Sequence, residues 1–137
     1  MIVMTKESLQ ILKEQDVILF RNRVKEFATK IGMSLLNQTK LITAASELVR
    51  NMLKYANGGV VILEIIGKDR VTGIRLTFTD KGPGIADIRL AMKDGYSTGK
   101  SLGLGLPGAK RLVNEFDIKS EVGKGTTVTI IRWKNGI

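Results

Sequence analysis

Apolar residues recur at the three- and four-residue spacing of a helix in two stretches of the first half of the chain. The first helix is predicted between Asp16, a candidate N-cap, and Gly32, a candidate stop. Its apolar face comprises Val17, Phe20, Val24, Phe27, Ala28 and Ile31. The second helix is predicted from Asn37 to Asn57, where an Asn-Gly-Gly sequence ends it. Its apolar face comprises Leu41, Ala44, Ala45, Leu48, Met52 and Tyr55.

Five segments predict strands, the first because it mixes apolar and polar residues over the length of a strand and the others because they contain β-branched residues. In chain order these are residues 8–14, 60–66, 74–79, 117–122 and 126–133. The second and third segments flank the turn-rich stretch 67–73, and the last two flank a turn at 123–125. Each of these two pairs is therefore expected to be antiparallel. Two shorter helices are predicted at 86–93 and 108–116.

These elements predict an α+β fold, a two-layer sandwich in which a mixed, mostly antiparallel sheet is covered on one face by helices. The other face of the sheet is expected to be partly polar. Its alternating threonines are Thr77, Thr79, Thr127 and Thr129. With 137 residues and no internal repeat or linker, the chain 1–137 is expected to form one domain.

The composition excludes several kinds of catalytic and metal site and limits the partners to be considered. The chain contains no Cys and no His, which excludes disulfides, thiolate or imidazole catalysis and metal sites built from those residues. Its net charge of +9 favours an anionic partner, but the basic residues are scattered and only 5% of residues are aromatic. Nucleotide phosphates, an acidic protein face or simple solubility are therefore favoured over nucleic acid. Because no apolar run could cross a bilayer and no secretory signal is evident, a cytoplasmic protein without membrane contact is expected.

Two glycine clusters give the strongest indication of a ligand. The first, Asp80-Lys-Gly-Pro-Gly84, follows a predicted strand, and the second, Gly103-Leu-Gly-Leu-Pro-Gly108, precedes a predicted helix. Glycines allow backbone amides to approach a ligand that a Cβ would keep away, and a helix N-terminus favours phosphate. The polar stretch 94–101 between the clusters is expected to form a lid. Together these features predict a nucleotide site.

Two familiar nucleotide motifs match only in part. Residues 95–101 resemble a Walker A loop, but Asp94 occupies the position of its first glycine and no apolar strand precedes it. Residues 103–108 fit the Gly-x-Gly-x-x-Gly pattern of dinucleotide-binding folds, but the strand and the acidic residue that such a fold requires are missing. Neither motif therefore identifies the site.

Two polar residues of the second predicted helix complete the set. Glu47 and Asn51 lie four residues apart and point the same way, among apolar neighbours that favour function over two solvated side chains. Followed by the two glycine clusters and by Gly125-Thr126, they resemble in order and spacing the GHKL ATP-binding family, which includes gyrase, Hsp90, MutL and the histidine-kinase catalytic domains. The similarity runs from Ser46 to Thr126. The short chain resembles the anti-sigma serine kinases, and residues 80–116 are similar to the stressosome switch kinases of that group.

The resemblance implies roles for the matching residues. Glu47 would be the general base, and Asn51 would bind the Mg²⁺ that bridges the ATP phosphates. Asp80 would accept the adenine amino hydrogen, and Thr126 would support adenine recognition through water. The glycines expected to pass close to the base are Gly82 and Gly84. The residues expected to contact the phosphates are Lys54, Gly103, Gly105 and Gly108, together with Ser97, Thr98 and Lys100 of the lid. For Lys54, a surface charge remains an equal alternative.

The resemblance also implies a function. It indicates an ATP- and Mg²⁺-dependent serine/threonine kinase that phosphorylates STAS-type antagonist proteins, activates a regulatory phosphatase and acts by partner switching in a stress-response sigma-factor pathway. The alternative is an anti-sigma factor that sequesters a sigma factor and uses ATP as a ligand. Arg21 and Arg50 are candidates for a protein-binding face near the first two helices. The residue chemistry alone leaves both functions open.

Overall fold

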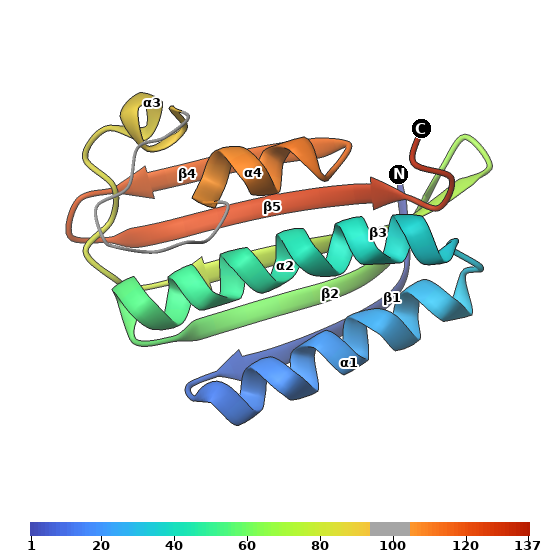
Figure 1. The fold of residues 1–137 in the computed structure, drawn as a ribbon, viewed down its shortest axis with the longest axis horizontal. Coiled ribbons are helices and arrows are strands. Elements are labelled where there is room, and N and C mark those ends of the chain that lie inside the picture. Colours follow the sequence, from blue (N-terminus) through green and yellow to red (C-terminus); the bar gives the residue numbers. More distant parts are fainter. Residues whose placement is uncertain (94–104) are drawn as a thin grey trace.

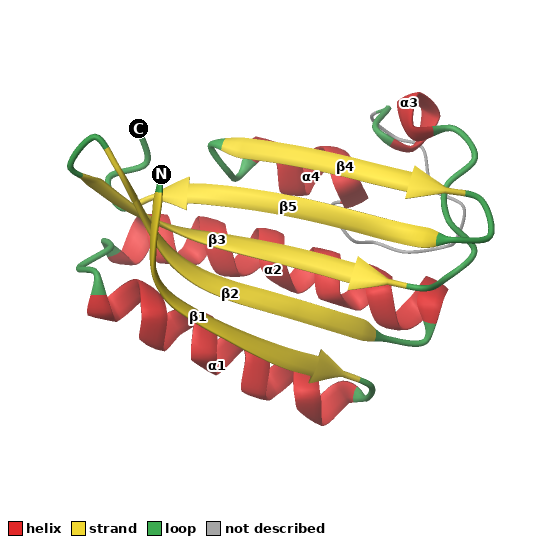
Figure 2. Cartoon of the chain, turned by 180° about the vertical axis from the view of Figure 1, so that it is seen from behind, coloured by secondary structure: helices red, strands yellow, loops and turns green. Residues whose placement is uncertain are grey.

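A computed structural model of the chain describes residues 1–93 and 105–137. The strands are β1 (Ile2–Ile11), β2 (Gly59–Lys68), β3 (Val71–Asp80), β4 (Glu115–Glu121) and β5 (Gly125–Trp133). They form one sheet in the order β1-β2-β3-β5-β4, in which every neighbouring pair is antiparallel. Helices cover one face of this sheet and leave the other uncovered (Figures 1 and 2). The predicted α+β sandwich is confirmed, with a sheet that is antiparallel throughout the described residues.

The described helices are α1 (Glu14–Lys30), α2 (Leu35–Ala56), α3 (Ile88–Ala91) and α4 (Gly105–Arg111). The prediction that Asp16 caps α1 is wrong. Lys13 is the N-cap, and Asp16 lies inside the first turn, where its carboxylate accepts hydrogen bonds from the amides of Leu12 and Lys13 at 2.9 and 3.1 Å. Ser34 caps the start of α2, and Asn57 ends that helix in the left-handed conformation at φ 58°. No helix of residues 1–93 and 105–137 is long and apolar enough to cross a membrane.

The predicted helix at 108–116 is partly wrong. Helix α4 ends at Arg111, and Phe116 lies in β4. The reason is Asn114, which already pairs with β5: its amide donates to the Ile131 carbonyl at 2.8 Å, and its side-chain oxygen accepts from the Trp133 amide at 2.9 Å. Because Asn114 is paired with β5 by these two bonds, the helix cannot continue through this residue.

Two strand predictions also change. Strand β1 runs from Ile2 to Ile11, earlier in the chain than the predicted 8–14, because it pairs with almost the whole of β2. Strands β2 and β3 extend through most of the stretch predicted as a turn. Their connection is a tight turn in which Asp69 and Arg70 have φ values of 51° and 68°. Two successive left-handed residues are typical of the type I′ hairpin turn.

The core lies between the helices and the sheet. In it the rings of Phe20 and Phe78 meet edge to face with centroids 5.8 Å apart. All predicted apolar positions of α1 and α2 are buried except Ile31, which is half-buried, and Tyr55, which is 43% exposed. The predicted faces of both long helices are therefore largely confirmed.

The uncovered face of the sheet is partly polar, as predicted, and carries apolar residues as well. Of the predicted threonines Thr79 is exposed, and Thr77, Thr127 and Thr129 are half-buried. Directly opposite each other on β2 and β3, Glu64 and Arg75 form a two-bonded ion pair with N···O distances of 2.8 and 3.0 Å. Beside it lies a second apolar cluster, made of Ile66, Ile131 and Trp133.

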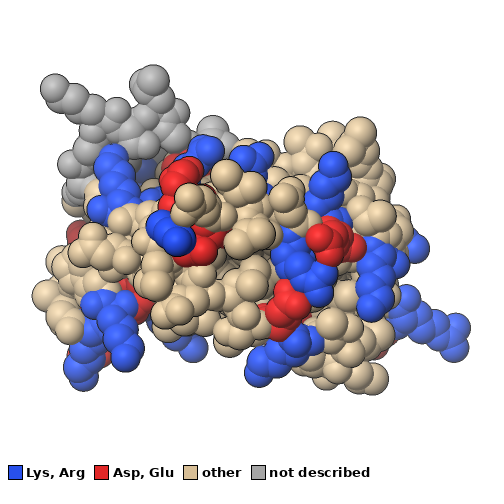
Figure 3. Space-filling view, turned by 90° about the horizontal axis from the view of Figure 1, so that it is seen from below, with Lys and Arg blue, Asp and Glu red and all other residues tan. Residues whose placement is uncertain are grey.

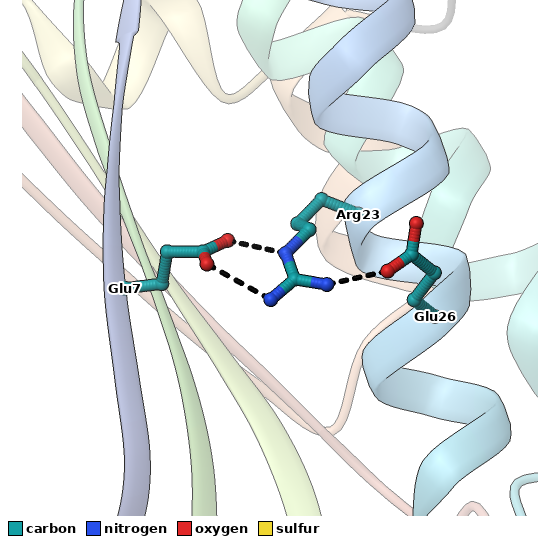
Figure 4. Close-up of polar contacts among 3 residues, drawn as sticks. All are labelled: Glu7, Arg23 and Glu26. Carbon is teal, nitrogen blue, oxygen red and sulfur yellow. Dashed lines mark hydrogen bonds and ion pairs between the residues drawn. The ribbon is translucent and has the colours of Figure 1, made fainter.

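Charged side chains also tie the first strand to the first helix. Figure 4 shows Arg23 of α1 held between Glu7 of β1, with N···O distances of 2.6 and 2.9 Å, and Glu26 one turn further along α1. The guanidinium also lies 5.0 Å from the centre of the Phe27 ring. Elsewhere on this side of the molecule the Lys and Arg side chains form several separate groups with acidic residues between them (Figure 3). The scattered charge expected from the sequence is therefore seen on this face of the molecule.

Candidate nucleotide-binding site

Three polar residues form a row across one end of the sheet. Asp80, the last residue of β3, lies opposite Thr126 of β5, and Thr126 lies opposite Ser120 of β4. Figure 1 shows that the helix α2 finishes at this same end of the sheet. The next row inward on the same side of the strands is apolar and consists of Phe78, Val128 and Ile118. A polar row above an apolar floor is the arrangement expected at the base end of a nucleotide site.

Asp80 is held in place by backbone amides. One carboxylate oxygen, Oδ1, accepts hydrogen bonds from the amide of Gly82 at 2.9 Å and from the amide of Thr126 at 3.2 Å. The other oxygen, Oδ2, accepts no hydrogen bond within residues 1–93 and 105–137. Asp80 is half-buried, so one oxygen is fixed by the protein and the other can receive a donor from a ligand.

Ser120 is a site residue that the sequence reasoning missed. Its hydroxyl accepts from the amide of Ile85 at 2.7 Å and lies 2.7 Å from the Thr126 hydroxyl and 3.1 Å from the Gly125 carbonyl. The sequence did hold a signal for it. The tight turn after Glu121 fixes the register of the hairpin, and this register places Ser120 opposite Thr126.

The glycines of the first cluster are required by close packing of the protein itself. A Cβ on Gly82 would approach the backbone of Ala56 in α2 to 3.0 Å, and a Cβ on Gly84 would overlap the carbonyl of Glu121 in β4. Gly84 also has a φ of 76°. A Cβ on Gly125 would in turn overlap the carbonyl of Asp80. These contacts lock the turn after β3 between α2 and the β4–β5 hairpin, so they position Asp80.

The predicted general base, Glu47, and the predicted Mg²⁺ ligand, Asn51, both belong to α2. Glu47 is 9% exposed, and its Oε1 accepts a hydrogen bond from the Gly105 amide at 2.9 Å. Asn51 lies one turn further along and is half-buried, and its side-chain amide makes no hydrogen bond with another described residue. Lys54, in the last turn of α2, is exposed, with its ammonium 5.1 Å from the centre of the Tyr55 ring. Glu47 thus contacts the start of α4.

The second glycine cluster is only partly described. Gly105, with a φ of 67°, begins α4, and Gly108 is buried within that helix. The remaining predicted phosphate contacts, Ser97, Thr98, Lys100 and Gly103, lie outside the described residues. The described part of the cluster therefore joins the site through the Gly105 amide and the Glu47 carboxylate.

The opposite end of α4 is held by a buried arginine. Arg132 of β5 is 7% exposed, and its guanidinium donates to the carbonyl of Leu112, just after α4, at 2.8 Å and to the side-chain oxygen of Asn37 in α2. Burial lowers the pKa of Arg132 from its ordinary value, and its Nε finds no hydrogen-bond partner among residues 1–93 and 105–137. A cation near the C-terminus of a helix complements the helix dipole. Together with Glu47, Arg132 fixes α4 at both ends against α2.

The residues present fit a purine nucleotide with a divalent cation. Asp80 Oδ2 offers an acceptor to an exocyclic amino group above the apolar floor of Phe78 and Val128. Asn51 offers an amide oxygen, a hard ligand of the kind that Mg²⁺ prefers, and this metal needs few protein ligands. Glu47 lies one helical turn from Asn51, where a carboxylate could act on a group near bound phosphates.

Comparison with known proteins identifies the family of this chain. Residues 36–136 match the family of histidine kinase-, DNA gyrase B- and HSP90-like ATPases, and the chain belongs to that family. The family resemblance drawn from the motifs is therefore confirmed. The match covers the whole site, from α2 to β5.

Two relatives and two solved structures are similar to this chain over most of its length. The chain is 39% identical over 125 residues to the serine/threonine-protein kinase RsbT of Bacillus subtilis, covering 91% of this chain and 94% of that protein. It is 33% identical over 115 residues to the anti-sigma F factor of Geobacillus kaustophilus, covering 79% and 77%. Among solved structures, the RsbU and RsbW domains of Rv1364c from Mycobacterium tuberculosis match with a TM-score of 0.63 and 20% identity, over 97% of this chain and 34% of that longer chain. The mycobacterial sensor histidine kinase MprB matches with a TM-score of 0.57 and 18% identity, over 97% and 100%. These two structures support the fold.

Proposed function

We propose that this protein is an ATP- and Mg²⁺-dependent serine/threonine kinase that phosphorylates STAS-type antagonist proteins and acts as a partner-switching regulator of a stress-response sigma-factor pathway in the cytoplasm. The observation that carries the proposal is the position of Glu47. Its carboxylate is buried, lies one turn from Asn51 and is bonded to the first residue of α4, and this supports a role as a base beside bound phosphates. The 39% identity to RsbT, over nearly the full length of both chains, supports the choice of kinase.

In this proposal the protein supplies alignment and a base. Phosphoryl transfer needs positioning and charge neutralisation more than covalent help. Asp80 and Thr126 would hold the adenine, and Asn51 would hold the Mg²⁺, which supplies positive charge between the phosphates. Lys54 and the glycines Gly103, Gly105 and Gly108 would contact the phosphates, with Ser97, Thr98 and Lys100 over the terminal one. Glu47 would accept the proton of the incoming serine or threonine hydroxyl.

The partner would bind beside the site. Leu12, Ile18 and Leu19 are 57%, 56% and 63% exposed at the start of α1, and Arg21 and Arg50 are exposed on the two long helices. Apolar side chains next to cations suit a protein surface with acidic residues. We propose that antagonist, and then a regulatory phosphatase, bind this face, and that nucleic acid and membranes do not.

The second candidate is an anti-sigma factor that sequesters a sigma factor with ATP as a ligand. The identity of 28 to 33% to several anti-sigma F factors favours it. Both candidates use the same nucleotide site, so binding of ATP does not separate them. Transfer of phosphate does.

The test is transfer of the labelled γ-phosphate of ATP to purified STAS-type antagonists encoded nearby, with and without Mg²⁺. Glu47→Gln is the informative variant because an amide oxygen can still accept from the Gly105 amide. The kinase predicts Mg²⁺-dependent transfer that is lost in Glu47→Gln while ATP binding persists. Absence of transfer together with a stable complex with a sigma factor would establish the second candidate instead.

A further inference from the structure

Helix α4 is too short to be stable by itself, and a buried charged side chain meets each of its ends. It has seven residues, Gly105–Arg111, whereas isolated helices need roughly twice that length to be stable in water. At its first residue, the Gly105 amide donates to the Glu47 carboxylate at 2.9 Å. Just after its last residue, the Leu112 carbonyl accepts from the Arg132 guanidinium at 2.8 Å. The position of α4 therefore depends on contacts that α2 and β5 supply.

Neither of these two buried charges has an opposite charge beside it. Glu47 and Arg132 form no ion pair with another residue of 1–93 or 105–137. The second acceptor of Arg132, the side-chain oxygen of Asn37, is neutral as well. A buried charge without a counter-ion is costly, so it needs another favourable interaction. Helix α4 supplies one, because its dipole complements an anion at its first turn and a cation at its last.

The contacts of Arg132 lead through α4 to the proposed base. Its guanidinium joins the end of α4 to Asn37 at the start of α2, and α4 spans about 10 Å between this end and Glu47. Within that length Gly108 and Ala109 are buried, so the helix is closely packed. A displacement of α4 at the Arg132 end is therefore carried to the amide that holds the Glu47 carboxylate.

We propose that Arg132 is a positioning residue for phosphate transfer, which fixes the end of α4 and so keeps the Gly105 amide against the Glu47 carboxylate. This inference rests on the proposed function, because it requires that Glu47 accept the proton of the incoming hydroxyl as the terminal phosphoryl group leaves ADP. Arg132 does not act by contact with the adenine, because Thr126 lies near the opposite end of β5, about 20 Å along the strand.

The variant Arg132→Met removes both hydrogen bonds and keeps a side chain of similar length. The rate of labelled phosphate transfer at saturating Mg-ATP should fall about 10- to 100-fold, the effect of a small misplacement of a catalytic group. Arg132→Lys keeps the charge but has no guanidinium fork, so its loss should be smaller. Arg75→Met is the matched control, because Arg75 lies on the neighbouring strand and pairs with Glu64 on the uncovered face. It should leave the transfer rate unchanged.

The decisive measurement repeats Arg132→Met in the Glu47→Gln protein, in which the base is already absent. If Arg132 acts through Glu47, the residual transfer should change less than about twofold, since both substitutions remove the same effect. Calorimetric titration with adenosine is the second readout, because adenosine lacks the phosphates that lie beside α4 in this proposal, and its affinity should not change. Equal losses of transfer in both backgrounds, or a parallel loss of adenosine affinity, would mean that Arg132 is only structural and would overturn the inference.

Thermal unfolding verifies that each variant is folded at the assay temperature. If the wild-type protein transfers no phosphate, the proposed function fails, and the inference fails with it. If the wild type transfers phosphate and Arg132→Met does so as fast as Arg75→Met, the inference alone fails and the proposed function stands.

Discussion

Glu47 and Gly105 are 58 residues apart in the sequence, yet the carboxylate of one accepts the backbone amide of the other at 2.9 Å. This bond joins the side chain proposed to do the chemistry to the helix proposed to lie against the phosphates. The same carboxylate therefore has a structural role beside its proposed catalytic role, and a single substitution would not separate the two.

Comparison of Glu47→Gln with Glu47→Ala separates the two roles. Glutamine keeps an oxygen that accepts from Gly105 but cannot act as a base, so phosphate transfer should fall by about 10²- to 10⁴-fold with little change in ATP affinity. Alanine loses the bond as well, so ATP affinity should also fall. Rates of labelled phosphate transfer and calorimetric titration measure the two effects. Equal ATP affinities in the two variants would show that the bond to Gly105 does not position α4.

Comparison of Gly84 with Gly123 tests whether the first glycine cluster needs glycine for close packing or only for its backbone conformation. Both have a left-handed φ, 76° and 80°, but a Cβ would overlap the Glu121 carbonyl at Gly84 and would meet nothing within 4 Å at Gly123. Gly123→Ala should therefore cost only the conformational term, roughly 1–2 kcal/mol. Gly84→Ala should cost more, because the turn must move away from the β4–β5 hairpin and break the bond between the Gly123 amide and the Pro83 carbonyl, 2.9 Å long.

Urea unfolding and ATP titration of the two variants measure this difference. Gly84→Ala should lose ATP affinity because Asp80 shifts with the turn, whereas Gly123→Ala should keep it. Equal stability losses would mean that the turn adapts to a Cβ, and the close packing would then not explain the glycine.

Much of this architecture could be predicted from the sequence because its signals are local. The apolar faces of α1 and α2, the hairpin of β4 and β5 and the motif residues Glu47, Asn51 and Asp80 all follow from spacing within one element or turn. Contacts between elements could not be predicted in the same way. The bonds of Asn114 to β5, which end α4 early, and of Ser120 to Ile85 join segments that only the folded sheet brings together.

Arg132 should stabilise the fold despite the desolvation of its charge. Arg132→Met leaves the Leu112 carbonyl and the Asn37 side-chain oxygen without their donor, and an unsatisfied buried group costs about 1–3 kcal/mol. Lys134→Met is the control, because it removes a nearby cation while keeping the Lys134 carbonyl that accepts from Asn37 at 3.3 Å. Urea unfolding at one pH should show the loss for Arg132→Met alone. A more stable Arg132→Met variant would show that desolvation of the guanidinium outweighs its hydrogen bonds.

Glu64 makes part of the stability dependent on pH. Its hydrogen bonds to Arg75 lower the pKa of its carboxyl below the ordinary value of 4.5. The pair therefore stabilises the folded state above that ordinary value, and this contribution is lost as the pH falls through the lower pKa of the folded protein. Glu64→Gln should reduce stability near pH 7 and show a weaker decline in acid than the wild type. Glu121→Gln, which alters an exposed pair with Lys124, should follow the wild-type curve in urea unfolding from pH 7 to pH 3. Parallel curves for Glu64→Gln and the wild type would contradict the assignment.

The hairpin between β2 and β3 should be easy to stabilise. Asp69 and Arg70 both have left-handed backbone conformations, and the second position of such a type I′ turn strongly prefers glycine. A non-glycine residue in this conformation costs roughly 1–2 kcal/mol. Glycine removes that strain, but it also makes the unfolded chain more flexible, which offsets part of the gain in stability. Arg70→Gly should therefore raise the free energy of unfolding by about 0.5–1 kcal/mol, whereas Arg70→Ala removes the same charge but keeps the Cβ and should not. Because the turn lies at the opposite end of β3 from Asp80, neither variant should change ATP affinity. If alanine stabilised the protein as much as glycine, the gain would come from the lost charge and not from the backbone conformation.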